Sequence, residues 1–488
     1  MRRKRFHDAE AALSGTGLRG AAPVDRRGRL LDAEKQGRKR LAYWRQITFW
    51  YAVLMLTVFL FYFDGNGYQQ ITQAKYTVFN ALSGGYIAAM ALVALDQIQI
   101  GALRPPTPLR LWRRAGWAQR LVTIYLALTW LSALCSPYWP ETALGGSRHE
   151  GALTITLYGL CFLLVSVFGK ADRRLLAVLG ASVSLFCLLC LVQLAGWNPF
   201  GLYPAGCGYA DAYTAYAGEF LGTLGNVDLV GAFLSLIIPI LVFSLARLPG
   251  RRRFLLLIPL ALAFVVLAGM SVLGGWLGVA LGCLTAVPVS GSRNPCVRKR
   301  LALGILALLA AGVAVAWAVD LGGELPHQLH QVLHGKLDPA FGSGRLHIWG
   351  EVLRRIPGRL LLGAGPDTMA HAGLEPFTRY DPGLGLTLMG HIDAAHNEYL
   401  NILYHQGIFA LGTYLGALGL LALQWVRCAR KADGAAVLGA GVCGYCVQAF
   451  FGISMFITAP FFWLALGLLA AEGGNSGQLS DVKLFERT

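Results

Sequence analysis

Long apolar segments recur along nearly the whole chain, and they restrict its fold more than any other feature. Hydrophobic residues make up 55% of the 488 residues, and charged residues make up only 14%. The mean hydropathy is +0.53. This composition excludes an ordinary soluble protein, and the segments are long enough to cross a bilayer as helices. The sequence therefore predicts an all-α, polytopic membrane protein.

We predict about 12 transmembrane helices. With the N-terminus inside, the connections expected to be cytoplasmic hold most of the Lys and Arg residues, and three outer connections hold none, as the positive-inside rule requires. Both termini are then cytoplasmic. The predicted spans contain no Asp, Glu, Lys or Arg. They are residues 47–63, 78–95, 121–135, 153–168, 175–194, 229–245, 254–269, 272–287, 301–319, 402–426, 435–451 and 457–471.

The regions outside the spans complete the expected organisation. The first 46 residues carry thirteen Lys or Arg against five Asp or Glu, which we interpret as an anchor to the inner leaflet rather than a nucleic-acid site. One outer loop is far longer than an ordinary connection. The expected boundaries are 1–46 for a basic cytoplasmic tail, 47–319 for transmembrane helices 1–9, 320–395 for the large outer loop, 396–471 for transmembrane helices 10–12, and 472–488 for a cytoplasmic tail.

The outer loop contains one predicted amphipathic helix. Ser343 is its expected N-cap, and Pro357-Gly358 is expected to end it. We expect this helix to lie at the outer membrane interface with its apolar face buried and its arginines toward the headgroups. The apolar face consists of Leu346, Trp349, Val352, Leu353 and Ile356.

Six arginines fall on the expected outer side, where membrane proteins normally avoid cations. Guanidinium groups bind a diphosphate in bidentate fashion, and a histidine of suitable pKa accepts a proton from an attacking hydroxyl. Arginine and histidine at an outer surface therefore favour chemistry on a diphosphate. Four of the six, Arg354, Arg355, Arg359 and Arg379, are expected to contact lipid headgroups. The six are Arg148, Arg345, Arg354, Arg355, Arg359 and Arg379.

Short motifs around these residues, taken in order, resemble the superfamily of O-antigen ligases and O-antigen polymerases. The resemblance extends over residues 120–420. Its motifs are Ser343-Gly344-Arg345 followed by Trp349, the stretch 357–365, His396-Asn397 with Gly407 beyond, Arg148–Gly151 with Thr154, Thr156 and Tyr158, and Gly222–Asn226.

The resemblance implies transfer of a glycan from undecaprenyl diphosphate to an acceptor hydroxyl. The reaction would take place on the outer face of the bacterial cytoplasmic membrane, without a metal or a cofactor. The acceptor would be a lipid-linked sugar or a protein hydroxyl. The resemblance also implies a fold related to the multispanning glycosyltransferases of the GT-C type. The expected partners are thus the lipid-linked glycan donor, the acceptor and the bilayer, and no nucleic acid.

The resemblance also suggests roles for individual residues. His396 is the expected catalytic base, and Asp393, three residues earlier, is expected to orient it. Arg345 is expected to bind the donor diphosphate with Arg148 as its partner. Asn397 and Ser343 complete the expected substrate-binding set. His347, His391 and His405 are expected to be structural.

Departures from the family pattern leave alternatives open. Val227-Asp228 stands where the family often has Pro-Asn, and no arginine lies at Gly218–Phe220 ahead of this motif. Arg148 has a second explanation as a weak surface partner of Glu150 or Asp211. For the whole chain, the alternative is a lipid-linked glycan flippase or another transporter, which the uncharged spans disfavour. Ligase and polymerase use the same donor and differ in the acceptor, so both are open.

Overall fold

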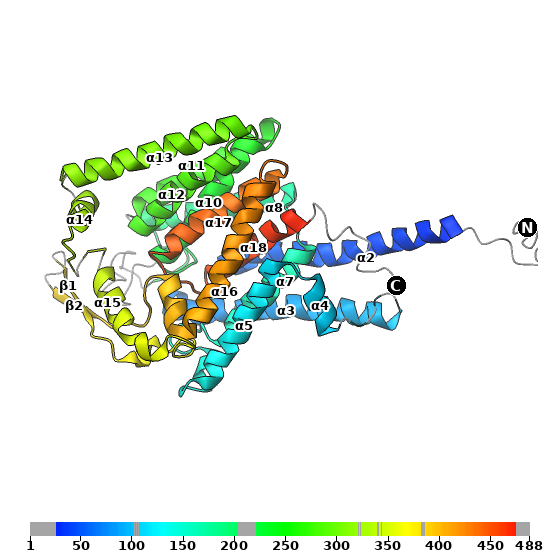
Figure 1. Ribbon diagram of the computed structural model, residues 1–488, viewed down its shortest axis with the longest axis horizontal. Helices are drawn as coiled ribbons and strands as arrows, with labels where there is room; N and C mark the ends of the chain where they lie inside the picture. Colours follow the sequence, from blue (N-terminus) through cyan, green and yellow to red (C-terminus); the bar gives the residue numbers. More distant parts are fainter. Residues whose placement is uncertain are drawn as a thin grey trace, which may run out of the picture.

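Helices form most of the protein in a computed structural model, which describes residues 26–474 except 102, 104, 106, 204–220, 271, 321, 323, 339–340, 343 and 382–385. The long helices pack into one bundle (Figure 1). They are α2 (Arg26–Leu54), α3 (Ile71–Gln99), α5 (Trp117–Cys135), α7 (Ala152–Phe168), α8 (Arg173–Leu194), α10 (Val227–Arg247), α11 (Leu257–Gly269), α12 (Leu273–Ser290), α13 (Pro295–Ala318), α16 (Glu398–Cys428), α17 (Asp433–Ala449) and α18 (Ala459–Gly474).

Shorter elements connect the long helices. The short helices are α4 (Pro108–Arg114), α6 (Glu141–Leu144), α14 (Glu324–Leu333) and α15 (Arg345–Arg355). A π-helix, η1 (Met55–Phe59), continues α2, and the 3-10 helices are η2 (Gly67–Gln70), η3 (Arg251–Leu256), η4 (Pro357–Arg359) and η5 (Met369–Ala372). Two strands, β1 (Phe377–Asp381) and β2 (Leu386–Gly390), pair antiparallel with Phe377 opposite Gly390. The all-α prediction did not include this hairpin.

Each predicted span overlaps one long helix. Eight of the described helices are long and apolar enough to cross a membrane, and α7 and α18 are shorter apolar helices. These features support a multi-pass membrane protein, whereas the number of twelve spans stays a prediction. One predicted boundary differs from the structure, because α2 begins at Arg26 inside the expected tail 1–46.

The helices extend beyond the predicted spans and therefore include charged residues. Lys75, in the first turns of α3, is fully buried. Its ammonium group donates hydrogen bonds to the carbonyl oxygens of Phe59 (2.5 Å) and Leu60 (2.8 Å), where η1 ends. A helix end leaves carbonyl groups without helical partners, so the lysine stabilises this end from inside the bundle.

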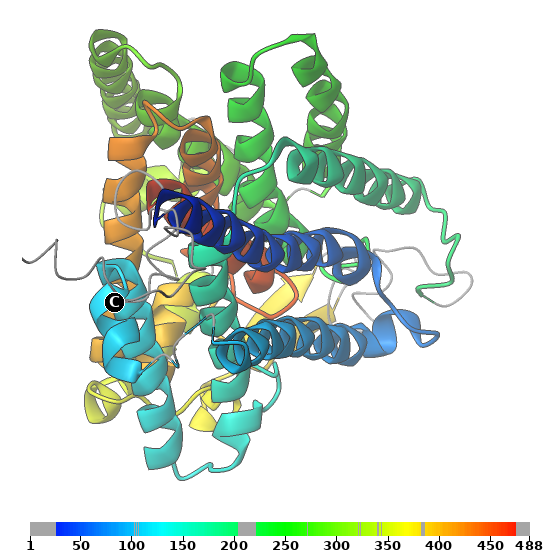
Figure 2. The ribbon, with the colours of Figure 1, turned by 90° about the vertical axis from the view of Figure 1, so that its right-hand side faces the viewer.

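α10 lies at the centre of the bundle, and most of its side chains are buried. It packs against α12 and α17, which approach each other closely. A Cβ atom at Gly282 of α12 would lie 2.4 Å from the Cα of Gly444 of α17. Small residues permit such contact between membrane helices, whose association depends on close packing. Figure 2 shows α2 and α3, in shades of blue, side by side on another face.

The segment predicted as the outer loop forms a cap at one end of the bundle. α14, α15 and the β-hairpin gather there (Figure 1). α15 begins at Arg345 and is capped by Gly344 rather than by Ser343, which lies outside the described residues. The helix ends before Pro357-Gly358, as predicted.

α15 packs onto the protein instead of presenting its apolar face to lipid. Ile348 and Val352 are buried in a cluster with Met369, Ala395 and other apolar residues of the segments before and within α16. The indole N–H of Trp349 donates to the carbonyl oxygen of Ala395 at 3.0 Å. Leu353, expected on the buried face, is 54% exposed. The predicted interfacial helix is therefore a docked one, and it holds Arg345 against the start of α16.

Candidate active site

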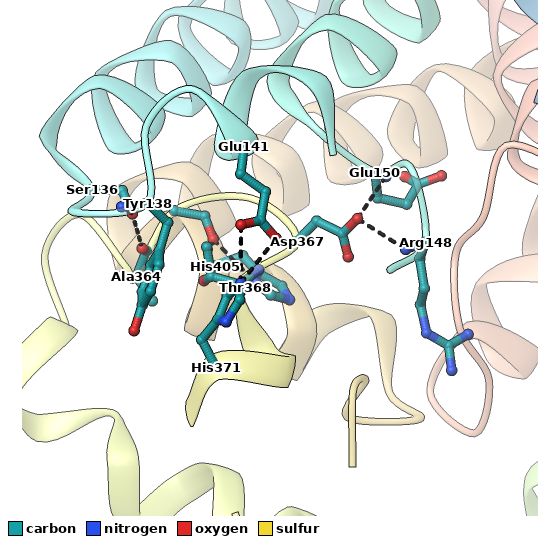
Figure 3. Close-up of polar contacts among 11 residues, drawn as sticks. Ser136, Tyr138, Glu141, Arg148, Glu150, Ala364, Asp367, Thr368, His371 and His405 are labelled. Atoms are coloured by element: carbon teal, nitrogen blue, oxygen red, sulfur yellow. Dashed lines mark hydrogen bonds and ion pairs between the residues drawn. The ribbon is translucent and has the colours of Figure 1, made fainter. Parts of the chain in front are cut away.

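Segments distant in the sequence meet at the end of the bundle that the sequence predicts to lie outside. Asp367 accepts hydrogen bonds from the backbone N–H groups of Arg148 (3.0 Å) and Glu150 (3.2 Å). Figure 3 shows the carboxylate of Asp367 directed at these two residues. Burial raises the pKa of Asp367, although the N–H groups that it accepts from oppose the shift. The carboxylate thus fixes the segment before α7 to the segment after α15.

Arg148 forms a bidentate ion pair with Asp393. Its Nε donates to Oδ2 at 2.9 Å, and its Nη2 donates to Oδ1 at 2.7 Å. Its Nη1 contacts only the sulfur of Met455, at 3.4 Å, which is a weak acceptor. Burial raises the pKa of Asp393, but the charge and hydrogen bonds of Arg148 outweigh burial and hold this pKa below its usual value. Among the described residues the carboxylate partner of Arg148 is therefore Asp393 and not Glu150. Asp211, the other expected partner, lies outside the described residues.

Arg345 is held by backbone carbonyl groups. Its Nε donates to the carbonyl oxygen of Phe451 at 3.0 Å, and its Nη1 donates to that of Gly342 at 2.9 Å. No hydrogen bond of its Nη2 to a described residue is found. Arg345 has no carboxylate partner within the described part of the chain, so its positive charge is not neutralised locally.

His396 lies two residues before the first residue of α16, close enough to Arg148 and Arg345 for their charges to act on it. Its pKa is lowered to about 4, first by burial and then by the positive charges of Arg148 and Arg345. The negative charges of Asp228 and Asp393 oppose this shift. The imidazole is therefore neutral near pH 7. No hydrogen bond between His396 and Asp393 is found among the described residues, and both carboxylate oxygens of Asp393 accept from Arg148. The charge of Asp393 still acts on His396, so orientation of His396 by Asp393 stays a prediction.

Three residues of this region adopt a left-handed backbone conformation that L-amino acids rarely use. They are His149 (φ 56°), Asp367 (φ 57°) and His396 (φ 47°), and among the described residues no other non-glycine residue has a positive φ. Such conformations cost roughly 1–3 kcal/mol each and persist where the surrounding structure enforces them, often at functional sites. The strain therefore marks the same place as the charges do.

Of the two remaining predicted site residues, the structure describes only Asn397. Asn397 is the N-cap of α16, and its side-chain oxygen accepts a hydrogen bond from the backbone N–H of Leu400 at 3.0 Å. It is only 6% exposed, so its side chain has a structural role here, and substrate binding by Asn397 stays a prediction. Ser343 lies outside the described residues.

A break in α16 joins the glycine-rich stretch after α15 to the membrane helices. Gly407 has a non-helical conformation (φ 82°, ψ 178°) inside α16. The carbonyl oxygens of Tyr404 and His405 accept hydrogen bonds from the backbone N–H groups of Ala364 and Gly365, both at 2.9 Å. A Cβ atom at Gly407 would lie 2.2 Å from the carbonyl oxygen of Leu361. The glycines thus permit contact between two backbones, and this contact places Asp367.

The comparison with known families agrees with this architecture. Residues 258–415 match the family described as O-Antigen ligase. We call this matched region the O-antigen ligase domain, because it is similar to that family. This match supports the chain's place in the O-antigen ligase superfamily. No curated protein matches the chain.

The O-antigen ligase domain holds Arg345, Asp367, Asp393 and His396, whereas Arg148 comes from outside the matched region. The tertiary structure brings Arg148 to the domain through two contacts, the backbone bond to Asp367 and the ion pair with Asp393. The site is therefore assembled from the matched domain and from the segment that precedes α7.

Beneath the ion pair, a small polar cavity of about 50 Å³ separates the ligase domain from α7. Glu150 is bonded there by the hydroxyl of Tyr158 (2.7 Å), and burial raises the pKa of Glu150 well above its usual value. Glu398 accepts from the hydroxyl of Tyr414 at 2.5 Å. Glu398 and Gln406 also line this space, and Glu398 Oε2 and Gln406 Oε1 have no hydrogen-bond partner among the described residues. A cavity of this size has room for a few water molecules and not for a sugar.

Sequence reasoning missed Asp367, Glu398 and Asp228 as members of the site. Asp367 follows the Gly-Ala-Gly turn and Glu398 follows His396-Asn397, so each stands next to a predicted motif. Asp228 was noted only as a departure from the family pattern, yet its charge acts on His396. The signal available in the sequence was the position of each residue beside a motif. Such a position does not show which way a side chain points.

The other outer arginines are tied to the cap. Arg354 pairs with Glu351, Arg355 donates to the carbonyl oxygen of Gly373 at 2.9 Å, and Arg359 donates to the hydroxyl of Tyr404 at 2.6 Å. These arginines thus contact the protein itself, in place of lipid headgroups or in addition to them. The side chain of Arg379 lies outside the described residues.

Two of the three histidines that were expected to be structural contact backbone carbonyl groups. His405 is buried and its Nδ1 lies 2.9 Å from the carbonyl oxygen of Gly365, which confirms a structural position. His347 Nε2 lies 3.4 Å from the carbonyl oxygen of Glu375. His391 is exposed.

Proposed function

We propose that the protein transfers a glycan from undecaprenyl diphosphate to an acceptor hydroxyl on the outer face of the bacterial cytoplasmic membrane, without a metal. The O-antigen ligase match supports glycan ligation or polymerisation at a membrane. The acceptor decides between a ligase and a polymerase. The observation that carries the proposal is the convergence of Arg148 and Arg345 on a neutral histidine, His396.

The two arginines are suited to bind the diphosphate of the donor. Arg148 Nη1 and Arg345 Nη2 each lack an oxygen acceptor among the described residues, while the other nitrogens of both groups are anchored. Anchored guanidinium groups bind phosphate with little loss of side-chain freedom. Asp393 then serves to position Arg148 and to limit the positive charge of the empty site.

His396 accepts the proton of the acceptor hydroxyl in this proposal. The acceptor oxygen forms a bond to the anomeric carbon, the bond from that carbon to the diphosphate oxygen breaks, and its electron pair leaves with the lipid diphosphate. A histidine with a pKa near 4 is a weak base. Because Arg148 and Arg345 lower this pKa, the negative diphosphate raises it when the donor binds. Donor binding therefore strengthens the base at the moment of transfer.

The transporter alternative requires a path wide enough for a lipid-linked glycan. Charged residues do line an internal space, but this cavity measures only about 50 Å³. The volume suits water, which favours chemistry at the surface over passage through the bundle.

Arg345→Lys tests the proposal in a reconstituted assay with a lipid-diphosphate glycan. Lysine keeps the charge but cannot donate to Phe451, Gly342 and a phosphate in the same geometry, so most transfer activity is expected to be lost while the protein still folds. Arg355→Lys is the matched control on the same helix, because Arg355 contacts only the cap. Full activity of Arg345→Lys would remove this residue from the site.

A further inference from the structure

An apolar groove lies at the end of the bundle opposite the arginine–histidine site. α8 packs mainly against α11, and a space of about 290 Å³ separates α8 from α10, α17 and α18. The walls are almost entirely aliphatic. They include Leu175, Leu176, Leu179, Leu236, Ile237, Ile240, Val437, Leu438, Leu464, Ala465 and Leu468.

Three connections that the sequence predicts to be cytoplasmic meet at the mouth of the groove. Asp172 and Arg173 at the start of α8, Leu248 after α10, and Asp433 at the start of α17 line it. Apolar walls with charged residues at one end match the cross-section of half a bilayer, in which acyl chains lie beneath headgroups.

The charges at the mouth leave one arginine available. Asp172 accepts from Arg174 at 2.7 Å, and Asp433 accepts from Arg293 at 2.7 Å. Both acids are thus neutralised. Arg173 is exposed, and no hydrogen bond or ion pair joins it to any part of the chain that the structure describes. The mouth therefore favours an anionic group.

We propose that this groove binds an anionic phospholipid of the adjacent leaflet, with one acyl chain between α8 and α18 and the phosphate at Arg173. Hydrophobic transfer contributes little to this binding, because the bilayer is as apolar as the groove. Van der Waals packing of the chain and the charge of Arg173 provide the selectivity instead. The site is independent of the glycan donor, since it lies at the other end of the bundle from Arg148.

This site is tested with the full-length protein in nanodiscs, which contain equal amounts of phosphatidylglycerol and phosphatidylcholine. After extraction, native mass spectrometry measures how many molecules of each lipid remain bound. The wild type is expected to retain phosphatidylglycerol in preference. Arg173→Gln is expected to weaken this preference roughly fivefold, because one arginine at an anionic surface contributes about 1 kcal/mol.

Two further variants separate the groove from general surface charge. Ala465→Phe fills the space between α8 and α18 and is expected to reduce retention of both lipids. Arg114→Gln removes another exposed arginine, in α4, which does not line the groove, and it is expected to behave as the wild type. Equal retention of the two lipids by the wild type, or an equal loss in Arg173→Gln and Arg114→Gln, would overturn the proposal. Transfer activity of Arg173→Gln is expected to be unchanged, so this test is separate from that of the proposed function.

Discussion

The bundle holds cavities of opposite character at its two ends. The cavity beneath Arg148 is small, about 50 Å³, and its walls carry buried carboxylates, tyrosines and a glutamine. The groove beside α8 is larger, about 290 Å³, and its walls are leucine, isoleucine and valine. The backbone strain at His149, Asp367 and His396 is confined to the polar end. Size is thus a poor guide to chemistry in this protein, whereas strain and charge coincide.

The difference has a physical reason. Buried polar groups need partners in defined positions, so the polar end is held by hydrogen bonds such as those of Asp367 and tolerates little movement. An aliphatic groove within a bilayer needs only contact with methylene groups, which many arrangements provide. We therefore expect the polar end to respond to the replacement of single atoms. The apolar end should respond to changes in side-chain volume and surface charge.

The side of the membrane on which each end lies gives the largest expected effect, because labelling of a cysteine from outside either occurs or does not occur. Glu375→Cys in the cap and Ser292→Cys before α13 are labelled with a membrane-impermeant thiol reagent in intact cells. The exposed native residues Cys135 and Cys296 are first replaced by serine, as is Cys207, which lies between the predicted spans 175–194 and 229–245. Only Glu375→Cys is expected to react. Reaction of Ser292→Cys alone would invert the topology and contradict an outer active site.

His396→Ala is expected to reduce transfer by about 10² to 10⁴, the range typical of a lost general base. Donor binding is expected to survive, because the arginines remain. The assay uses purified protein and a lipid-diphosphate glycan. His391→Ala is the matched control, since His391 is exposed and only five residues away. Wild-type turnover in His396→Ala would leave the mechanism to the arginines alone.

Asp367→Ala is expected to weaken donor binding about tenfold or more. The backbone N–H groups of Arg148 and Glu150 lose their shared acceptor, and a lost hydrogen bond to a charged group costs about 1.5–3 kcal/mol. Asp367→Asn keeps an acceptor and tolerates the left-handed conformation, so it is expected to retain most binding. Leu176→Met in the apolar groove should leave donor binding unchanged. Equal loss in the Ala and Asn variants would show that the position of Arg148 does not depend on this contact.

The pH dependence gives the smallest effect. In the proposed mechanism the neutral form of His396 is the active one, and its pKa is lowered to about 4 before the donor binds. Activity is therefore lost as the pH falls through the pKa, and kcat/KM, which reports the free enzyme, should show no loss of His396 function near pH 6.5. The loss in kcat should appear at higher pH, because the bound diphosphate offsets the arginines. Identical profiles for kcat and kcat/KM would contradict this coupling.

Part of the site follows from local sequence. The start of α16 behind His396-Asn397 and the stop at Pro357-Gly358 were predicted, because caps and proline act over a few residues. The partner of Arg148 was not predicted. Asp393 lies 245 residues away in the chain, and no periodicity or spacing connects two residues at that separation.

The sequence by itself determined that this chain is a multi-pass helical membrane protein with its arginines and histidine in a few short motifs, because hydropathy and turn chemistry depend on neighbouring residues alone. Only the tertiary structure decided which charges meet. It packed α15 on the protein, paired Asp393 with Arg148, and used Asn397 as a helix cap. These outcomes depend on packing between segments far apart in the chain, where burial and the satisfaction of each polar group are decided together.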